Sequence, residues 1–286
     1  MTRPAIAIDA WASYISPEGA KKWPADYLHI FKKYRSPQVI FDGMPIEQMI
    51  QEMDAAGVDR CVLSAFYHKD VAIASNEEVA ELVKRFPDRF IGSGTVNVLR
   101  KPMDVAGQVT RLITELGLKA VRLEPYMYGD GVTGLAPNDK HYWPVYIKCS
   151  ELGVPVCIQV GHTGPTLPSE CGRPIYLDEI ALAFPDLKII GCHLGQPWHE
   201  EMMTLAWKHP NVYVETSART PKHWPASFVE FARGWGRDKV MWATDYPLLS
   251  FERTLAELDA MDFTEDVHRK IVRGNALTAF GLEDTA

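Results

Sequence analysis

Short runs rich in apolar and β-branched residues alternate with longer segments of helical periodicity along the whole chain. Several runs are almost continuously apolar, which is typical of parallel strands covered on both faces. The predicted strands are Ala5–Ala10, Arg60–Ala65, Phe90–Val96, Leu118–Leu123, Pro155–Val160, Lys188–Cys192, Val212–Glu215 and Val240–Ala243. The segments between them repeat apolar residues every three or four positions, as Ile46, Met49 and Met53 do. The predicted helices are Ile46–Ala56, Asn76–Phe86, Asp104–Leu116, Tyr142–Leu152, Tyr176–Phe184, His199–Lys208, Ala226–Trp235 and Phe251–Met261.

This alternation predicts an α/β fold, a (β/α)8 TIM barrel with an extra C-terminal helix over Asp266–Phe280. The links from helix to strand are short, whereas several links from strand to helix are long, including Trp11–Pro45 and Glu124–His141. Barrel enzymes elaborate the loops that follow the strands, so the asymmetry favours an enzyme. An open doubly wound sheet is the alternative fold. Because no low-complexity linker interrupts the pattern, residues 1–286 are predicted to form a single domain.

Composition and charge narrow the classes of partner. The formal net charge is −7 and the basic residues are scattered, which argues against nucleic acid as a partner. No segment reaches the roughly 18 apolar residues of a membrane span, which argues against a membrane. The five cysteines are odd in number and form no Cys-x-x-Cys pair, so we expect buried thiols in a reducing compartment. The protein is therefore expected to be cytoplasmic.

Polar residues begin abruptly where the apolar strands end. In a barrel these ends meet at one mouth, so Asp9, His162, His193 and Asp245 are expected to converge there. One interpretation is a metal site made by Asp9, His162 and Asp245, a mixed oxygen and nitrogen set that suits a divalent ion. The other is a metal-free pair in which Asp245 and a histidine act as general acid and base. Structural alternatives are Asp9 as a brace of the mouth and Asp245 as a turn cap.

The substrate class is inferred from cationic and aromatic residues near the same ends. Arg122 ends a strand and Arg219 lies in a long loop, and a guanidinium group pairs well with a carboxylate. Trp11 and Tyr126 belong to an aromatic-rich rim that suits a planar or cyclic ligand. With Glu124 they complete the predicted substrate-binding residues. The expected partner is a small carboxylate.

Several segments at these strand ends carry a family resemblance. They are Ala7-Ile8-Asp9-Ala10, Ala55-Ala56-Gly57-Val58-Asp59, Phe86-Pro87-Asp88-Arg89-Phe90, Val160-Gly161-His162, Cys192-His193-Leu194-Gly195 and Ala243-Thr244-Asp245-Tyr246-Pro247. In their order and spacing the chain resembles the amidohydrolase superfamily, in particular the amidohydrolase-2 branch. That branch includes aminocarboxymuconate semialdehyde decarboxylase and related decarboxylases, hydratases and lactonases. The likeness covers nearly the whole chain.

The resemblance implies a divalent metal held by His162 and Asp245, zinc first, with manganese or magnesium as alternatives. It implies that His193 polarises the substrate or moves a proton, and it implies a homodimer. The chain departs from the family at strand one, where the usual Asp-x-His-x-His reads Asp9, Trp11 and Ser13. Trp11 cannot bind a metal, because its indole nitrogen is only a donor. A histidine-rich zinc shell is therefore excluded, and Asp9 could act as the strand-one ligand only after a two-residue shift.

Three functions follow from these observations. The first is an amidohydrolase-like enzyme that uses a metal to hydrolyse or decarboxylate a small carboxylated cyclic or ring-opened compound. Sequence does not separate the two reactions, since fold does not decide chemistry. The second is a metal-free lactonase-type hydrolase, which the missing strand-one histidines favour. The third is a barrel that has lost catalysis and only binds a ligand, which the retained His193 and Asp245 oppose.

Overall fold

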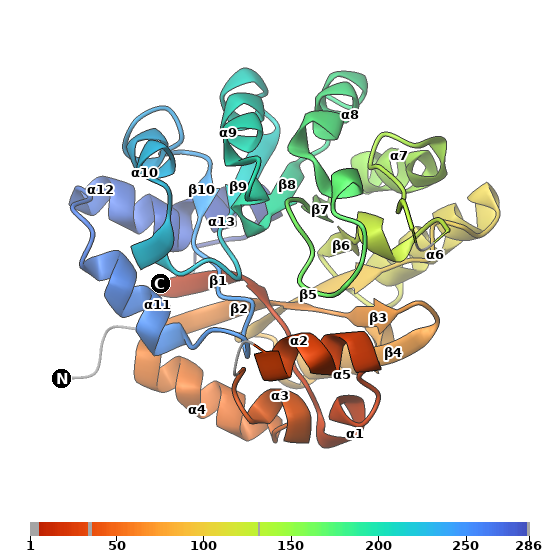
Figure 1. The fold of residues 1–286 in the computed structure, drawn as a ribbon, viewed down its shortest axis with the longest axis horizontal. Coiled ribbons are helices and arrows are strands. Elements are labelled where there is room, and N and C mark those ends of the chain that lie inside the picture. The colour runs from red at the N-terminus through yellow and green to blue at the C-terminus, as the bar shows by residue number, and fades with distance from the viewer. Residues whose placement is uncertain (1–5, 34–35, 131, 285–286) are drawn as a thin grey trace.

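The eight strands of one parallel sheet form a barrel. The structure, a computed structural model, describes residues 6–33, 36–130 and 132–284, so Ala5 of the first predicted strand lies outside the described residues. The strands are β1 (Ala7–Ala12), β2 (Val58–Ser64), β5 (Phe90–Thr95), β6 (Ala120–Leu123), β7 (Val156–Gln159), β8 (Ile189–Cys192), β9 (Val212–Glu215) and β10 (Val240–Met241), paired in that order. Ala10 N donates to Trp242 O at 3.2 Å and Asp245 N donates to Trp11 O at 2.9 Å. These bonds join the first strand to the last, which confirms the predicted TIM barrel (Figure 1).

Helices lie outside the strands, as the periodicity predicts (Figure 1). They are α4 (Ile46–Ala56), α5 (Asn76–Arg85), α6 (Pro102–Thr114), α7 (Trp143–Leu152), α8 (Leu177–Ala183), α9 (His199–Lys208), α10 (Ala226–Arg233) and α11 (Phe251–Asp259). Local signals set their ends. Ser75 and Glu78 form a capping box that begins α5. Gly57 ends α4 with a φ of 76°, a left-handed conformation that glycine adopts without strain.

The core has two layers because alternate residues of each strand face opposite ways. In β7, Val156 and Ile158 pack in the cluster between sheet and helices, whereas Cys157 belongs to the cluster inside the barrel. Ile8 and Ile190 fill the same interior. All five cysteines are free and buried, as expected of thiols. No helix among the described residues is both long and apolar enough to cross a membrane.

The predicted C-terminal helix is present but interrupted. It consists of α12 (Glu265–Arg269), a π-helical turn (Lys270–Gly274) and α13 (Asn275–Phe280). From the π turn, Arg273 Nη1 donates to Ile6 O at 2.8 Å and to an Asp59 carboxylate oxygen at 2.9 Å. Ile6 and Asp59 lie at the starts of β1 and β2, so this segment covers the end of the barrel opposite the mouth.

The long link after β1 and a hairpin after β2 cover part of the mouth. The link contains α1 (Pro17–Ala20), α2 (Ala25–Lys33) and α3 (Val39–Asp42), and the hairpin pairs β3 (Phe66–His68) with β4 (Val71–Ala74). Tyr27 of α2 packs on Phe66 of the hairpin with ring centroids 5.6 Å apart, and Trp23 does so at 5.5 Å. Figure 1 shows α2 beside β3 and β4. An aromatic cluster therefore covers one side of the strand ends.

Candidate active site

The predicted site residues lie at or just after the C-terminal ends of the strands. Four non-glycine residues there have a left-handed backbone, each within a few residues of a strand end: His193 (φ 57°), Leu194 (φ 62°), Ala218 (φ 56°) and Asp245 (φ 61°). L-residues adopt this conformation at a cost, and such residues concentrate at functional sites. The backbone thus marks the ends of β8, β9 and β10 as the candidate site.

Asp9 is fully buried and braces the first strand to the last. Its Oδ1 accepts from the backbone N–H groups of Trp11 and Thr244, both at 3.0 Å, and its Oδ2 accepts from the Thr244 hydroxyl. Burial raises the pKa of Asp9 from 3.8 to about 8, although these hydrogen bonds oppose the shift. The carboxyl group is therefore mostly protonated at neutral pH, and both oxygens are already engaged.

Trp11 connects Asp245 with Arg122 at the centre of the mouth. Its indole Nε1 donates to Asp245 Oδ1 at 3.1 Å, and the Arg122 guanidinium lies 3.9 Å from the centroid of its ring. Burial raises the pKa of Asp245, and the charge of Arg122 opposes that rise. Sequence reasoning placed these three residues in one site, and the structure brings them together.

Arg122 is itself buried and contacts two aromatic rings. Phe66 lies on it at 5.1 Å, in addition to Trp11, and its Nη2 forms an ion pair with Glu124. Its Nε and Nη1 are covered and have no hydrogen-bond partner among the described residues. Leaving such donors unmet is costly, about 1–3 kcal/mol each, so this group is suited to an incoming anion. Burial raises the pKa of Glu124, and the charge of Arg122 opposes the rise.

His193 is held in a buried hydrogen-bonded chain. Its Nε2 lies 2.7 Å from Gln159 Oε1 and its Nδ1 lies 2.6 Å from Ser217 Oγ. Ser217 Oγ donates in turn to Glu215 Oε1 at 2.8 Å, and Glu215 also accepts from the His193 backbone N–H at 2.9 Å. Burial lowers the pKa of His193 to about 3, helped by the charges of Arg219 and Arg122. The imidazole is therefore neutral at physiological pH.

Glu215 closes this chain. Burial raises its pKa to about 7, against hydrogen bonds from Ser217 and His193. The carboxyl can therefore exchange a proton near neutral pH.

His162 is exposed and turned towards an arginine. Its Nδ1 lies 3.0 Å from Thr163 O, and Arg219 Nη2 lies 2.9 Å from its Nε2. Since a carbonyl only accepts and a guanidinium only donates, Nδ1 carries the proton and the Nε2 lone pair points at Arg219. Arg219 thus lies at the mouth, as predicted, with His162 as a partner.

The arrangement of the predicted ligands does not fit a bound divalent ion. Both oxygens of Asp9, Oδ1 of Asp245 and Nε2 of His162 each accept a hydrogen bond within the protein. Metal ligands must offer a free lone pair, so an ion would compete with these hydrogen bonds. In residues 6–33, 36–130 and 132–284, no three His, Cys, Asp or Glu side chains are grouped so that they could hold an ion.

A pocket of about 510 Å³ opens at the mouth beside this cluster. Glu124 and Tyr126 line it together with Tyr67 and His68 of the hairpin. The hydroxyl of Tyr126 lies 3.2 Å from that of Tyr27, which ties the pocket wall to α2. The volume suits a ligand of one ring.

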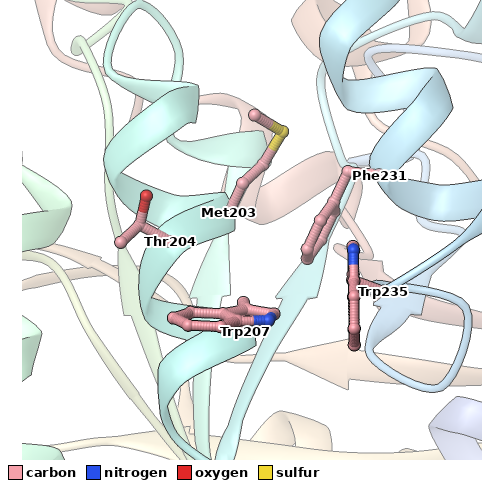
Figure 2. A pocket seen from close by; sticks show the side chains of 5 residues that line it. All are labelled: Met203, Thr204, Trp207, Phe231 and Trp235. Atoms are coloured by element: carbon pink, nitrogen blue, oxygen red, sulfur yellow. The ribbon is translucent and has the colours of Figure 1, made fainter.

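A second pocket of about 350 Å³ lies between α9 and α10, on the outside of the barrel. Figure 2 shows the five side chains that line it, Met203, Thr204, Trp207, Phe231 and Trp235. Trp207 and Trp235 are 61% and 80% exposed. Because none of these side chains titrates at ordinary pH, this pocket offers no acid–base group and is not the candidate active site.

The fold and the strand-end residues define a class of protein, and comparison with known families identifies it. The family model described as "Amidohydrolase" matches residues 8–282, so the chain belongs to the amidohydrolase family. This confirms the resemblance drawn from the strand-end motifs and an enzyme of that type, and it leaves little support for a barrel without catalysis.

Two curated relatives and one solved structure are similar over most of the chain. A 2-amino-3-carboxymuconate-6-semialdehyde decarboxylase of Dictyostelium discoideum is 24% identical over 280 residues, 82% of this chain and 76% of its own. A gamma-resorcylate decarboxylase of Rhodococcus jostii is 24% identical over 293 residues, 85% and 86% of the two chains. The crystal structure of a 5-carboxyvanillate decarboxylase of Novosphingobium aromaticivorans, complexed with manganese and 4-hydroxy-3-methoxy-5-nitrobenzoic acid, has a TM-score of 0.73. It is 20% identical and the match covers 99% of this chain and 100% of that chain, a likeness that shows the fold.

Sequence reasoning missed the residues that fix the predicted ones. Thr244 donates to Asp9, Ser217 and Gln159 form hydrogen bonds with His193, and Phe66 packs on Arg122. Ser217 and Thr244 follow strand ends, so the strand-end rule could have found them; Phe66 lies in a hairpin that carries no turn signal.

Proposed function

We propose that the protein is an amidohydrolase-family enzyme that decarboxylates a small ring carboxylate. The observation that carries the proposal is Arg122, a buried guanidinium with two unmet donor nitrogens and two aromatic rings packed on it. A planar carboxylate would pair with these donors, and Arg is the residue that best matches carboxylate geometry. The curated relatives named above, both decarboxylases by name, support the same reaction class.

The pocket beside Arg122 supports a substrate of one ring. Its volume of about 510 Å³ lies within the range of small-molecule sites, and Tyr126 offers it an aromatic wall. Glu124 forms an ion pair with Arg122 and lines the pocket, so it fixes the orientation of the guanidinium. The substrate ring would lie against Tyr126 with its carboxylate directed to Arg122.

Decarboxylation exchanges a carboxylate for a proton on the same carbon. The bond to the carboxyl carbon breaks, CO2 leaves, and the electron pair left on the ring carbon forms a bond to the incoming proton. Asp245 is the acid we assign to this step, because Trp11 holds its Oδ1 next to the guanidinium that would bind the substrate. His193 is neutral and bonded through both ring nitrogens, so we assign it an orienting role.

Hydrolysis of a carboxylated lactone is the second candidate. The poor fit of Asp9, His162 and Asp245 to a metal ion favours it, since the missing strand-one histidines already pointed to a metal-free hydrolase. Cytoplasmic location, a single domain and a homodimer stay predictions.

The test measures CO2 release and proton uptake in the same reaction. Wild-type protein is incubated with gamma-resorcylate, 5-carboxyvanillate and carboxylated lactones, and CO2 and proton uptake are recorded. Decarboxylation releases CO2 and takes up one proton per turnover, whereas lactone hydrolysis releases a proton and no CO2. We expect CO2 release that Arg122→Met abolishes and Arg237→Met, at an exposed arginine, leaves intact. No CO2 from any ring carboxylate, with proton release from a lactone, would favour the second candidate.

A further inference from the structure

Hydrogen-bond donors of the protein already occupy atoms of the predicted ligands that a divalent ion would need. Arg219 Nη2 lies 2.9 Å from the lone pair of His162 Nε2, and Trp11 Nε1 lies 3.1 Å from Asp245 Oδ1. We propose that this site works without a resident divalent ion and that Arg122 supplies the fixed positive charge that holds the substrate carboxylate. The inference deepens the proposed function and rests on its carboxylate site.

An ion at the predicted ligands would have to displace hydrogen bonds that the protein already makes there. Thr244 would have to leave Asp9 and Arg219 would have to leave His162, and at Asp245 the indole of Trp11 already occupies Oδ1. Trp11 bonds Asp9 through its backbone N–H and Asp245 through its indole, and the side chain is fully buried, so the indole cannot turn away from Asp245 without opening the core of the mouth.

The charge of Arg122 also opposes a bound cation. Arg122 is always protonated, is buried, and acts on both Asp245 and His193 through its charge. A divalent cation beside it would be repelled strongly, because water screens little in such a site. The rings of Trp11 and Phe66, at 3.9 and 5.1 Å, stabilise the guanidinium there instead.

Arg122 can bind the substrate carboxylate in place of an ion. It presents donors to an anion, and two of its nitrogens, Nε and Nη1, are without a partner in the described part of the chain. Glu124 anchors only Nη2. The same guanidinium is thus oriented by one carboxylate of the protein and left able to bind a second one from the substrate.

The experiment measures metal content and metal binding apart from activity. The metal content of protein purified without added metal or chelator is determined by plasma mass spectrometry, and the protein is then dialysed against a chelator and against metal-free buffer. Zinc and manganese are then titrated by calorimetry, and the melting temperature is recorded with and without each ion. We expect well under one equivalent of metal, no saturable heat, and a shift below about 1 °C. One equivalent retained by wild type and lost in Asp245→Asn, or a rise of about 5 °C, would overturn the proposal.

A second measurement separates this proposal from the proposed function. Binding of gamma-resorcylate and of 4-hydroxy-3-methoxy-5-nitrobenzoate is measured by calorimetry with and without chelator. An affinity unchanged within about twofold supports a metal-free site, and a tenfold loss on chelation would overturn it. If neither probe binds under any condition and the protein holds no metal, the proposed carboxylate function is wrong, and so is the role of Arg122. If the protein holds metal but neither probe binds, only the metal-free proposal is overturned.

Discussion

The buried pair of Arg122 and Glu124 predicts a large coupling energy. Their side chains are only 5% and 7% exposed, so solvent screens them little. Two unit charges about 4 Å apart interact by about 4 kcal/mol at an effective dielectric constant near 20. Removing one partner of such a pair costs about 3–5 kcal/mol, because the other charge is left buried without compensation. We therefore expect Arg122→Met and Glu124→Gln each to lower the free energy of unfolding by this amount.

The double variant tests whether the two costs share one cause. With both charges gone, no unpaired charge remains, so its loss in the free energy of unfolding should fall short of the sum by about 3 kcal/mol. Urea unfolding at pH 7, followed by circular dichroism, measures all four proteins. The exposed pair of Arg111 and Glu77, joined at 2.8 Å and with side chains 45% and 54% exposed, is the matched control and should couple by less than about 1 kcal/mol. If the losses in unfolding free energy of the two single variants add up to that of the double variant within about 0.5 kcal/mol, the reasoning is refuted.

Three further predictions concern the same mouth. The folded pKa of Glu215, about 7, lies above the ordinary 4.5, so the native state holds an extra proton between these values and stability falls as pH rises through them. Glu215→Gln should reduce that fall between pH 5 and 7, measured by urea unfolding at both pH values, by about 2 kcal/mol; an unchanged fall would contradict the assignment. Ser217→Ala removes a hydroxyl 2.6 Å from His193 Nδ1 and should lower kcat about tenfold. Ser217→Thr keeps a hydroxyl and should have a kcat close to that of wild type. Equal kcat values for all three proteins would exclude the orienting role. Gly161→Ala, at φ 87° and against a backbone carbonyl of the loop after β8, should cost about 2–4 kcal/mol in urea unfolding, and Gly153→Ala, at φ 68° in open space, about 1 kcal/mol; equal costs would contradict the packing argument.

The strands and outer helices could be predicted because the pattern of apolar residues in each segment matches the burial of only one kind of element. Ile46, Met49 and Met53 face the core at helical spacing, and the structure buries all three. The β3–β4 hairpin escaped prediction because its turn carries Lys69 at φ 56° where glycine or asparagine would have signalled it. The helix over Asp266–Phe280 was predicted as continuous because the π turn keeps the backbone helical and no proline marks the change.

The site was predictable in its location and less so in its contacts. The strand-end rule gives the position of a Cα atom, and hence places Asp9, His162 and Asp245 around one mouth. It does not give the rotamer or the partner. Asp9 accepts a hydrogen bond from Thr244, and His162 accepts one from Arg219; both donors lie far from their acceptors in the sequence. Such long-range hydrogen bonds decide whether three potential ligands make a metal site, and no local pattern reports them.

The central claim is that Arg122 binds the carboxylate of the substrate, and calorimetry tests it most directly. Benzoate, gamma-resorcylate and 4-hydroxy-3-methoxy-5-nitrobenzoate are titrated into wild type, Arg122→Lys and the double variant Arg122→Met with Glu124→Gln, which leaves no buried charge unpaired. Primary amides of the same acids are the ligand controls, and Arg237→Met, at an exposed arginine, is the protein control. The account predicts that at least one acid binds wild type, that its amide binds at least about tenfold more weakly, and that the double variant loses about 10- to 150-fold in affinity. Equal affinity of the double variant and wild type, or of acid and amide, would contradict it.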